Sequence, residues 1–213
     1  MNYASKCHLV EEKIDGIGPW LWPVEDWEGY RWPKEDWLNS HRDKWLSTVK
    51  NRKICIQAGG LCGMYPRLLS EHFEFVYTFE PDPLNFYCLA NNCQKDNIIK
   101  MQAALGHKNT LVGTDTYISH NRGMTKIVDG SSIPMLTIDS LNLPACDFIQ
   151  LDIEGMEAEA LIGARDTILK YKPVVCIEKF WTDKTDPSLI LSSYGYVEAY
   201  QSAVLDFVYI PSS

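Results

Sequence analysis

The chain has 213 residues, and its 46% hydrophobic and 23% charged residues are typical of a globular protein with one domain. The formal net charge of −8 at pH 7 gives no general electrostatic attraction to nucleic acid, so no nucleic-acid partner is expected. No apolar run is long enough to span a membrane, and the first residues lack the pattern of a signal peptide, so the sequence predicts a cytoplasmic location.

The seven cysteines are scattered along the chain, and none of them forms a Cys/His group with zinc spacing. The sequence therefore predicts no metal centre. Most of the cysteines stand inside apolar runs, which favours buried thiols over a disulfide framework. Reduced thiols also suit the reducing compartment that a cytoplasmic protein occupies.

Six of the seven tryptophans lie in the first 50 residues, with a short repeat, WPVEDW at 22–27 and WPKEDW at 32–37. In each copy proline follows tryptophan and two acids come next, which is typical of the first turn of a helix. The second copy is predicted to continue as a helix to about Lys50. We interpret residues 1–50 as a Trp-rich helical segment, either a lid over a ligand site or a packing segment, and 51–213 as the main domain.

From residue 53 onward, apolar strand patterns alternate with helix patterns. This alternation predicts a doubly wound, mainly parallel sheet with helices on both faces, which binds ligands beyond the carboxyl ends of its strands. The last two strands are expected to form an antiparallel pair. Strands are predicted at 53–58, 75–80, 98–106, 110–119, 132–139, 146–154, 172–180, 196–201 and 204–210, and helices at 63–73, 84–93 and 156–171.

The first of these strands runs into a glycine loop at 57–63, and the second ends at Glu80. A glycine loop that opens a helix lets the backbone approach a ligand, and an acid about 20 residues later can bind a ribose diol. Glu80 lies 21 positions after Gly59. A dinucleotide loop would read GxGxxG, but Ala58 takes the first position, and the later chain has no second half for a nicotinamide. The pattern predicts a cofactor with one ribose and no phosphate, S-adenosylmethionine.

Four stretches, GGLCGMY (59–65), FEPDP (79–83), AALG (103–106) and TIDSLNLPACDFIQLDIEGMEAEALIGA (137–164), resemble the FkbM family of S-adenosylmethionine-dependent methyltransferases. The resemblance covers about residues 54 to 180. It implies the class I methyltransferase fold, a Rossmann-like α/β structure with a seven-stranded, mainly parallel sheet and an antiparallel terminal hairpin. It also implies O-methylation of a hydroxyl on a sugar, a glycan or a small metabolite.

Carried over by position, the resemblance assigns roles to particular residues. Asp152 and Glu154 become the candidate catalytic residues, with Asp152 placed to orient or deprotonate the acceptor hydroxyl. The chain departs from the family at Gln57, where the family has an acid, and at Gln150, where lysine is frequent. The predicted cofactor-binding residues are Gln57, Ala58, Gly59, Gly60, Leu61, Gly63, Glu80, Pro81, Ala103, Ala104 and Asp152.

The same residues allow other interpretations. The glycines could form a strand-to-helix turn without a ligand, and Asp152 could cap the helix that follows it. Because Gln57 brings no charge to oppose the cofactor ammonium, the chain could be a catalytically weak or inactive module that keeps the fold and the cofactor. A nicotinamide enzyme is a third possibility.

Overall fold

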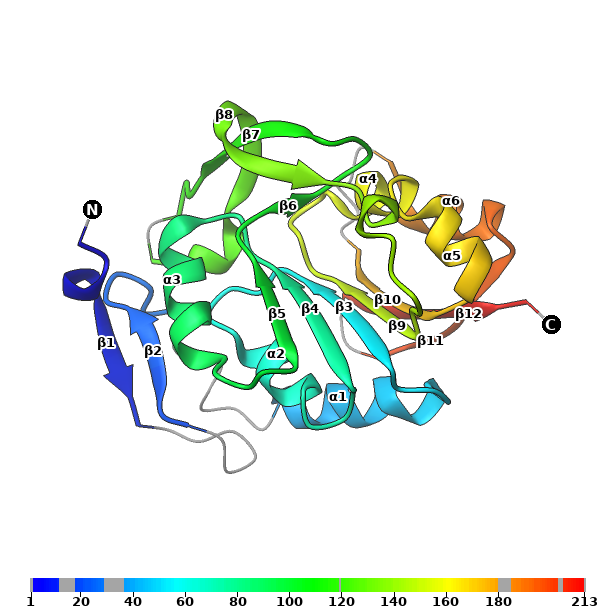
Figure 1. Cartoon of the computed structure of the whole chain (residues 1–213), viewed down its shortest axis with the longest axis horizontal. Coiled ribbons are helices and arrows are strands. Elements are labelled where there is room, and N and C mark those ends of the chain that lie inside the picture. Colours follow the sequence, from blue (N-terminus) through cyan, green and yellow to red (C-terminus); the bar gives the residue numbers. More distant parts are fainter. Residues whose placement is uncertain are drawn as a thin grey trace.

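A seven-stranded sheet forms the centre of the computed structural model, which describes residues 2–11, 18–28, 37–118, 120–179, 185–202 and 205–212 (Figure 1). Its strands are β3 (Ile54–Ala58), β4 (Phe75–Phe79), β5 (Ile98–Met101), β9 (Phe148–Leu151), β10 (Val174–Glu178), β11 (Tyr196–Gln201) and β12 (Asp206–Pro211). They lie in the order β11-β12-β10-β9-β3-β4-β5. The five strands from β10 to β5 are parallel, and β12 is antiparallel to both of its neighbours. The predicted mainly parallel sheet with a terminal hairpin is confirmed.

Helices cover both faces of this sheet, as predicted (Figure 1). The alternation of side chains along β3 explains the two layers, because successive residues of a strand point to opposite faces. Ile56 packs in one core with Ala160 and Ile168, whereas Cys55 packs in another with Trp45 and Leu69. The helices are α1 (Trp37–Thr48), α2 (Met64–Leu69), α3 (Pro83–Asn92), α4 (Glu157–Ile162), α5 (Arg165–Tyr171) and α6 (Pro187–Ser193), with 3-10 turns η1 (Ala4–Lys6), η3 (Arg122–Met124) and η4 (Asp139–Leu141).

Two predicted elements are each divided in the structure. The strand predicted at 98–106 becomes β5 and β6 (Ala104–Leu105), and β6 joins a separate sheet with β7 (Thr110–Asp115) and β8 (Lys126–Leu136) beyond the carboxyl ends of the main strands (Figure 1). The helix predicted at 156–171 breaks between α4 and α5 at Gly163. A Cβ at Gly163 would lie 2.1 Å from the carbonyl oxygen of Gly106, so the break lets two backbones meet. Helix α6 was not predicted.

The N-terminal segment is not wholly helical. Strands β1 (Cys7–Val10) and β2 (Trp20–Pro23) pair in an antiparallel way, and the first Trp-Pro repeat ends β2 instead of opening a helix. Its Trp22 is fully buried against Met64 and Leu68, and apolar packing therefore decides its conformation. Residues 32–36 of the second repeat lie outside the described residues, and helix α1 is described from Trp37.

The cysteines are free thiols, as predicted, and six of the seven are buried. Burial raises the pKa of most of them, including Cys55 and Cys146, because a thiolate is poorly solvated in an apolar core. Within the described part of the chain, every helix is too short or too polar to cross a membrane.

Candidate functional site

A cavity of about 280 Å³ opens at the carboxyl ends of β3, β4 and β9. The chain winds from β3 to β4 and β5 on one side and then crosses to β9 and β10 on the other, so the cavity lies where the strand order reverses. The structure brings ten of the twelve predicted site residues to its wall: Ala58, Gly59, Gly60, Leu61, Glu80, Pro81, Ala103, Ala104, Asp152 and Glu154. Gln57 and Gly63 do not line it.

The glycine loop is held between two neighbouring strands. The N–H groups of Gly59 and Gly60 donate to the carbonyl oxygen of Phe79 at the end of β4, at 3.2 and 2.9 Å. Gly59 has φ +83°, and a Cβ there would lie 1.8 Å from the carbonyl oxygen of Asp152 at the end of β9. Only glycine allows this approach, so Gly59 brings the loop and the acid of β9 to one edge of the cavity.

Glu80 is a buried carboxyl group with a fixed orientation. The residue is 5% exposed, and its two carboxyl oxygens accept hydrogen bonds from the N–H of Leu61 at 2.7 Å and of Asp82 at 2.8 Å. Burial raises the pKa of Glu80 to about 8, although these two backbone donors act in the opposite direction. The acid is thereby held at the cavity with lone pairs left to accept hydrogen bonds from a diol.

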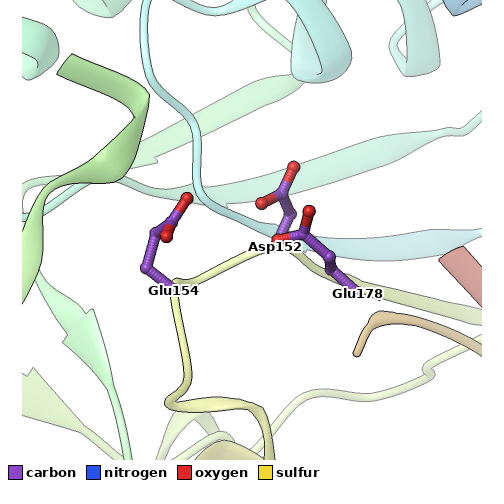
Figure 2. A group of neighbouring side chains, drawn as sticks. All are labelled: Asp152, Glu154 and Glu178. Atoms are coloured by element: carbon purple, nitrogen blue, oxygen red, sulfur yellow. The ribbon is translucent and has the colours of Figure 1, made fainter. Parts of the chain in front are cut away.

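Three carboxyl groups gather at another part of the wall, Asp152, Glu154 and Glu178 (Figure 2). Each offers an oxygen within 4.8 Å of the others. Burial raises the pKa of Glu154 to about 7 and, with the charge of Asp152, that of Glu178 to about 11. Burial also raises the pKa of Asp152, whereas its contact with Glu178 lowers it, so the proton of this pair resides on Glu178. Oxygen atoms at this spacing could also serve as ligands of a divalent cation, so the absence of a metal centre stays a prediction.

This acidic group sets an expected pH dependence of stability. Carboxyl groups whose pKa is raised in the folded chain bind more protons there than in the unfolded chain, where the pKa of glutamate is about 4.3. The stability they contribute is present below that pH and is lost as the pH rises through the folded pKa values near 7 and 8 of Glu154 and Glu80. Urea unfolding of the free chain should therefore give a larger free energy of unfolding near pH 5 than near pH 8. Glu178→Gln should reduce this dependence, and an unchanged slope would contradict a protonated Glu178 in the folded chain.

Gln57 belongs to a hydrogen-bonded row beneath the loop. It is fully buried, its Nε2 donates to Gln150 Oε1 at 3.0 Å and to the carbonyl oxygen of Gly59 at 3.1 Å, and its Oε1 accepts from Thr78 Oγ1 at 2.6 Å. Gln57, Thr78 and Gln150 stand side by side in register on β3, β4 and β9. The two positions at which the chain departs from the family pattern thus contact each other, and a neutral pair takes the place of an acid and a lysine.

A paired substitution tests this arrangement. Gln57→Asp should lower the free energy of unfolding by about 1–3 kcal/mol, because it removes both donors and turns a carboxylate toward Gln150 Oε1. Adding Gln150→Lys should restore part of the loss by supplying the opposite charge. Chemical denaturation of the wild type, both single variants and the double variant measures the coupling. Strictly additive effects would show that the two positions are independent.

A segment that sequence reasoning missed completes the cavity wall. Residues 121–125, around η3, line the cavity together with Asn85 of α3. Glu178 was also missed as a site residue, although an acid at the end of a parallel strand is a usable signal. The 121–125 segment carries no such signal, since it lies far along the chain from the glycine loop and reaches the cavity only through the second sheet.

Comparison with known protein families places the chain in one of them. The FkbM methyltransferase domain model matches residues 65–200. The chain belongs to the FkbM methyltransferase family. Membership implies S-adenosylmethionine as the cofactor, as predicted, and the buried Glu80, the close-packed Gly59 and the cavity at the strand-order reversal fit that molecule. A comparison with curated proteins gave no match.

Solved structures support the class I methyltransferase fold. The FkbM methyltransferase from Methylobacillus flagellatus KT is 24% identical with a TM-score of 0.53, and the match covers 75% of this chain and 43% of that one. The present chain thus spans less than half the length of that structure. A ribosomal protein L11 methylase from Lactobacillus delbrueckii subsp. bulgaricus is 6% identical over 83% of this chain and 78% of its own, with a TM-score of 0.52. These similarities concern the fold alone.

Proposed function

We propose that this FkbM family chain is an S-adenosylmethionine-dependent O-methyltransferase that acts on a hydroxyl group of a sugar, a glycan or a small metabolite. One observation carries the proposal: Glu80 and Asp152 line the same cavity from β4 and β9, the two strands on either side of β3. A group that can bind ribose and a group that can act on an acceptor are thereby held on opposite sides of the glycine loop.

The chain's own residues supply binding, orientation and proton handling. S-adenosylmethionine, when bound, supplies an activated methyl group. Glu80 would accept hydrogen bonds from its ribose hydroxyls, and the backbone of the glycine loop would contact its methionine part. Asp152 lines the cavity and orients the acceptor hydroxyl or takes up its proton, and its pKa, raised by burial, favours proton uptake. Bringing the two reactants into line accounts for much of the expected acceleration.

We propose that the N-terminal segment, residues 1–50, helps to close the cavity, which is lined by residues of the main domain, 51–213. Trp27 is 54% exposed and stacks on His120, with the ring centroids 5.0 Å apart. His120 directly precedes the 121–125 segment of the cavity wall. The N–H of Glu28 donates to the carbonyl oxygen of His120 at 3.1 Å. Other tryptophans of the segment, including Trp20 and Trp22, are buried in the core, so the segment contributes packing as well.

Cofactor binding gives the first test. Calorimetric titration should show binding of S-adenosylmethionine and no binding of NAD. Glu80→Ala should weaken binding by about 1–3 kcal/mol, since the variant loses two hydrogen bonds to the ribose hydroxyls. Glu74→Ala removes an exposed glutamate just before β4 and should leave the affinity unchanged. Wild-type affinity in a folded Glu80→Ala variant would contradict the assignment of Glu80.

Methyl transfer to a panel of sugar and small-molecule hydroxyls, followed by mass spectrometry, gives the second test. Transfer to a hydroxyl oxygen supports the proposed reaction, and the panel identifies the acceptor class. Tight cofactor binding without transfer to any acceptor would point instead to the alternative of a cofactor-binding module that has lost turnover.

A further inference from the structure

Arg122 is the basic side chain in an acidic cavity. Among the described residues that line the wall it is the only arginine, lysine or histidine, and it stands with four acids: Glu80, Asp152, Glu154 and Glu178. It opens η3, the short turn between β7 and β8 that forms part of the wall. The positive charge of Arg122 therefore stands among acids that could pair with it.

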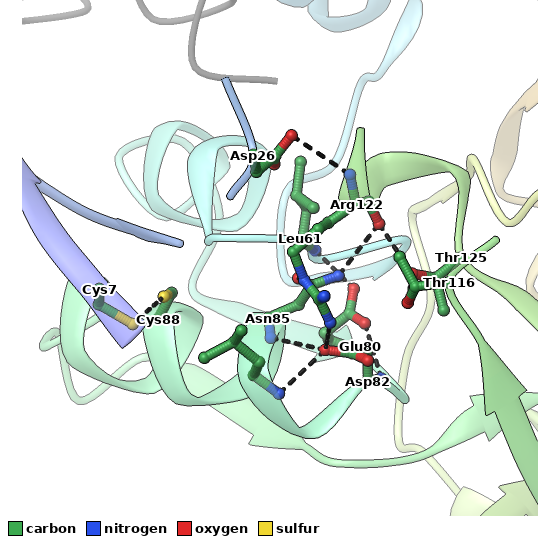
Figure 3. Close-up of polar contacts among 11 residues, drawn as sticks. Cys7, Asp26, Leu61, Glu80, Asp82, Asn85, Cys88, Thr116, Arg122 and Thr125 are labelled. Atoms are coloured by element: carbon green, nitrogen blue, oxygen red, sulfur yellow. Dashed lines mark hydrogen bonds and ion pairs between the residues drawn. The ribbon is translucent and has the colours of Figure 1, made fainter. Parts of the chain in front are cut away.

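The guanidinium group of Arg122 is held against the start of α3 (Figure 3). Its Nη2 donates to Asp82 Oδ1 at 2.6 Å, and its Nε donates to Asn85 Oδ1 at 2.9 Å. The side chain of Arg122 is 11% exposed and that of Asp82 is 9% exposed. An ion pair with this burial and two fixed donors is stronger and less screened than a surface pair.

The backbone of Arg122 is held from both sides as well. Its N–H donates to Asp26 Oδ1 at 3.2 Å, and its carbonyl oxygen accepts from Asn85 Nδ2 at 3.2 Å (Figure 3). Asp26 is fully buried in the N-terminal segment, where its other oxygen accepts from Trp22 Nε1 at 3.1 Å. Arg122 thus joins the N-terminal segment to α3.

The same contacts reach Glu80, on the side of the cavity that we propose binds the ribose of the cofactor (the ribose side). Asp82, which pairs with Arg122, donates its N–H to Glu80 Oε1 at 2.8 Å and also caps α3. The other oxygen of Glu80 accepts from Leu61 in the glycine loop. A continuous set of hydrogen bonds therefore runs from Trp22 through Asp26, Arg122, Asp82 and Glu80 to Leu61.

We propose that Arg122 is a positioning residue that holds the 121–125 wall and the N-terminal segment against the ribose side of the cavity and thereby sets the affinity for the cofactor. It acts through Asp82 and Asn85 and takes no part in methyl transfer. The physical reason is preorganisation: a wall already fixed in the free chain loses less conformational freedom when the cofactor binds. The inference rests on the proposed function for the identity of that cofactor.

Titration with S-adenosylhomocysteine, the demethylated product, tests the proposal without turnover. Arg122→Ala should raise the Kd roughly tenfold to a hundredfold, the range expected for lost hydrogen bonds of a charged group. Arg122→Lys keeps the charge without the planar fork and should recover part of the affinity. Asp26→Ala should also raise the Kd, although Asp26 does not line the cavity, and the double variant should bind little worse than Arg122→Ala.

Arg165→Ala is the matched control, because Arg165 is 61% exposed, pairs with Asp166 on the surface and lies outside the cavity wall. Urea unfolding of each free variant separates loss of stability from loss of affinity, and kcat at saturating cofactor should change much less than the KM for cofactor. Should Arg122→Ala not fold, Arg122→Met, which keeps much of the side-chain length but neither the charge nor the N–H donors, gives the same comparison.

Three outcomes would overturn parts of this inference separately. Wild-type affinity in a folded Arg122→Ala or Arg122→Met variant would overturn the positioning role while leaving the proposed function intact. Additive effects of Asp26→Ala and Arg122→Ala would overturn the link to the N-terminal segment. A wild-type chain that binds no S-adenosylhomocysteine would overturn the proposed function and this inference together.

Discussion

Gly59→Ala is expected to abolish measurable cofactor binding and to lower the free energy of unfolding by roughly 3 kcal/mol or more. Two effects add in this variant. The residue has φ +83°, a conformation that disfavours any side chain, and its new methyl carbon would lie 1.8 Å from the carbonyl oxygen of Asp152. The loop and the end of β9 would have to separate, and the cavity between them would change shape. Urea denaturation and titration with S-adenosylhomocysteine measure the two consequences.

Gly195→Ala is the control that separates backbone strain from collision. Gly195 has a nearly equal φ of +81°, but a Cβ there would meet its nearest atom, Ser212 Oγ, at 3.7 Å, an ordinary contact. This variant should lose only the roughly 1–2 kcal/mol that a left-handed conformation costs a residue with a side chain, and it should bind cofactor normally. If both variants lost the same stability, close approach at Gly59 would not be the constraint.

Asp152→Asn is expected to reduce the rate of methyl transfer by about 10²–10⁴-fold, the usual contribution of a positioned general base. The amide has nearly the same shape as the carboxyl group, but it cannot take up the acceptor proton, and it removes the charge that raises the pKa of Glu178. Single-turnover measurement with saturating cofactor reports the chemical step. The fold should be retained, because the substitution removes one of several acids that repel each other in the cavity.

Asp147→Asn makes the same chemical change just before β9, at the opposite end of the sheet. Asp147 accepts hydrogen bonds from the N–H groups of Lys53 and Ile54 and does not line the cavity, so the turnover of this variant should match the wild type. An Asp152→Asn variant that also transferred methyl groups at the wild-type rate would show that Asp152 serves the loop or the helix start and not the reaction.

The sequence alone determined the parts of the molecule that depend on local pattern. The apolar run at 54–58 marks β3, and the glycines that follow mark the turn at its carboxyl end. The 21-residue interval from Gly59 to Glu80 places the acid at the end of the next strand, and parallel strands bring both ends to one edge. Fold class, cofactor and ten of the residues that line the cavity follow, because strand period and glycine conformation are properties of short segments.

Only the tertiary structure decided which distant residues meet. Gln57 was expected at the cofactor, yet the register of β3 with β4 and β9 turns it toward Thr78 and Gln150 instead. Arg122 carried no motif, and it reaches Asp82, 40 positions earlier in the chain, only because the second sheet folds over the strand ends. The helix predicted at 156–171 breaks because Gly163 meets the backbone of Gly106. These contacts join residues whose separation along the chain is set by the path of the whole fold, and no short window of sequence contains them.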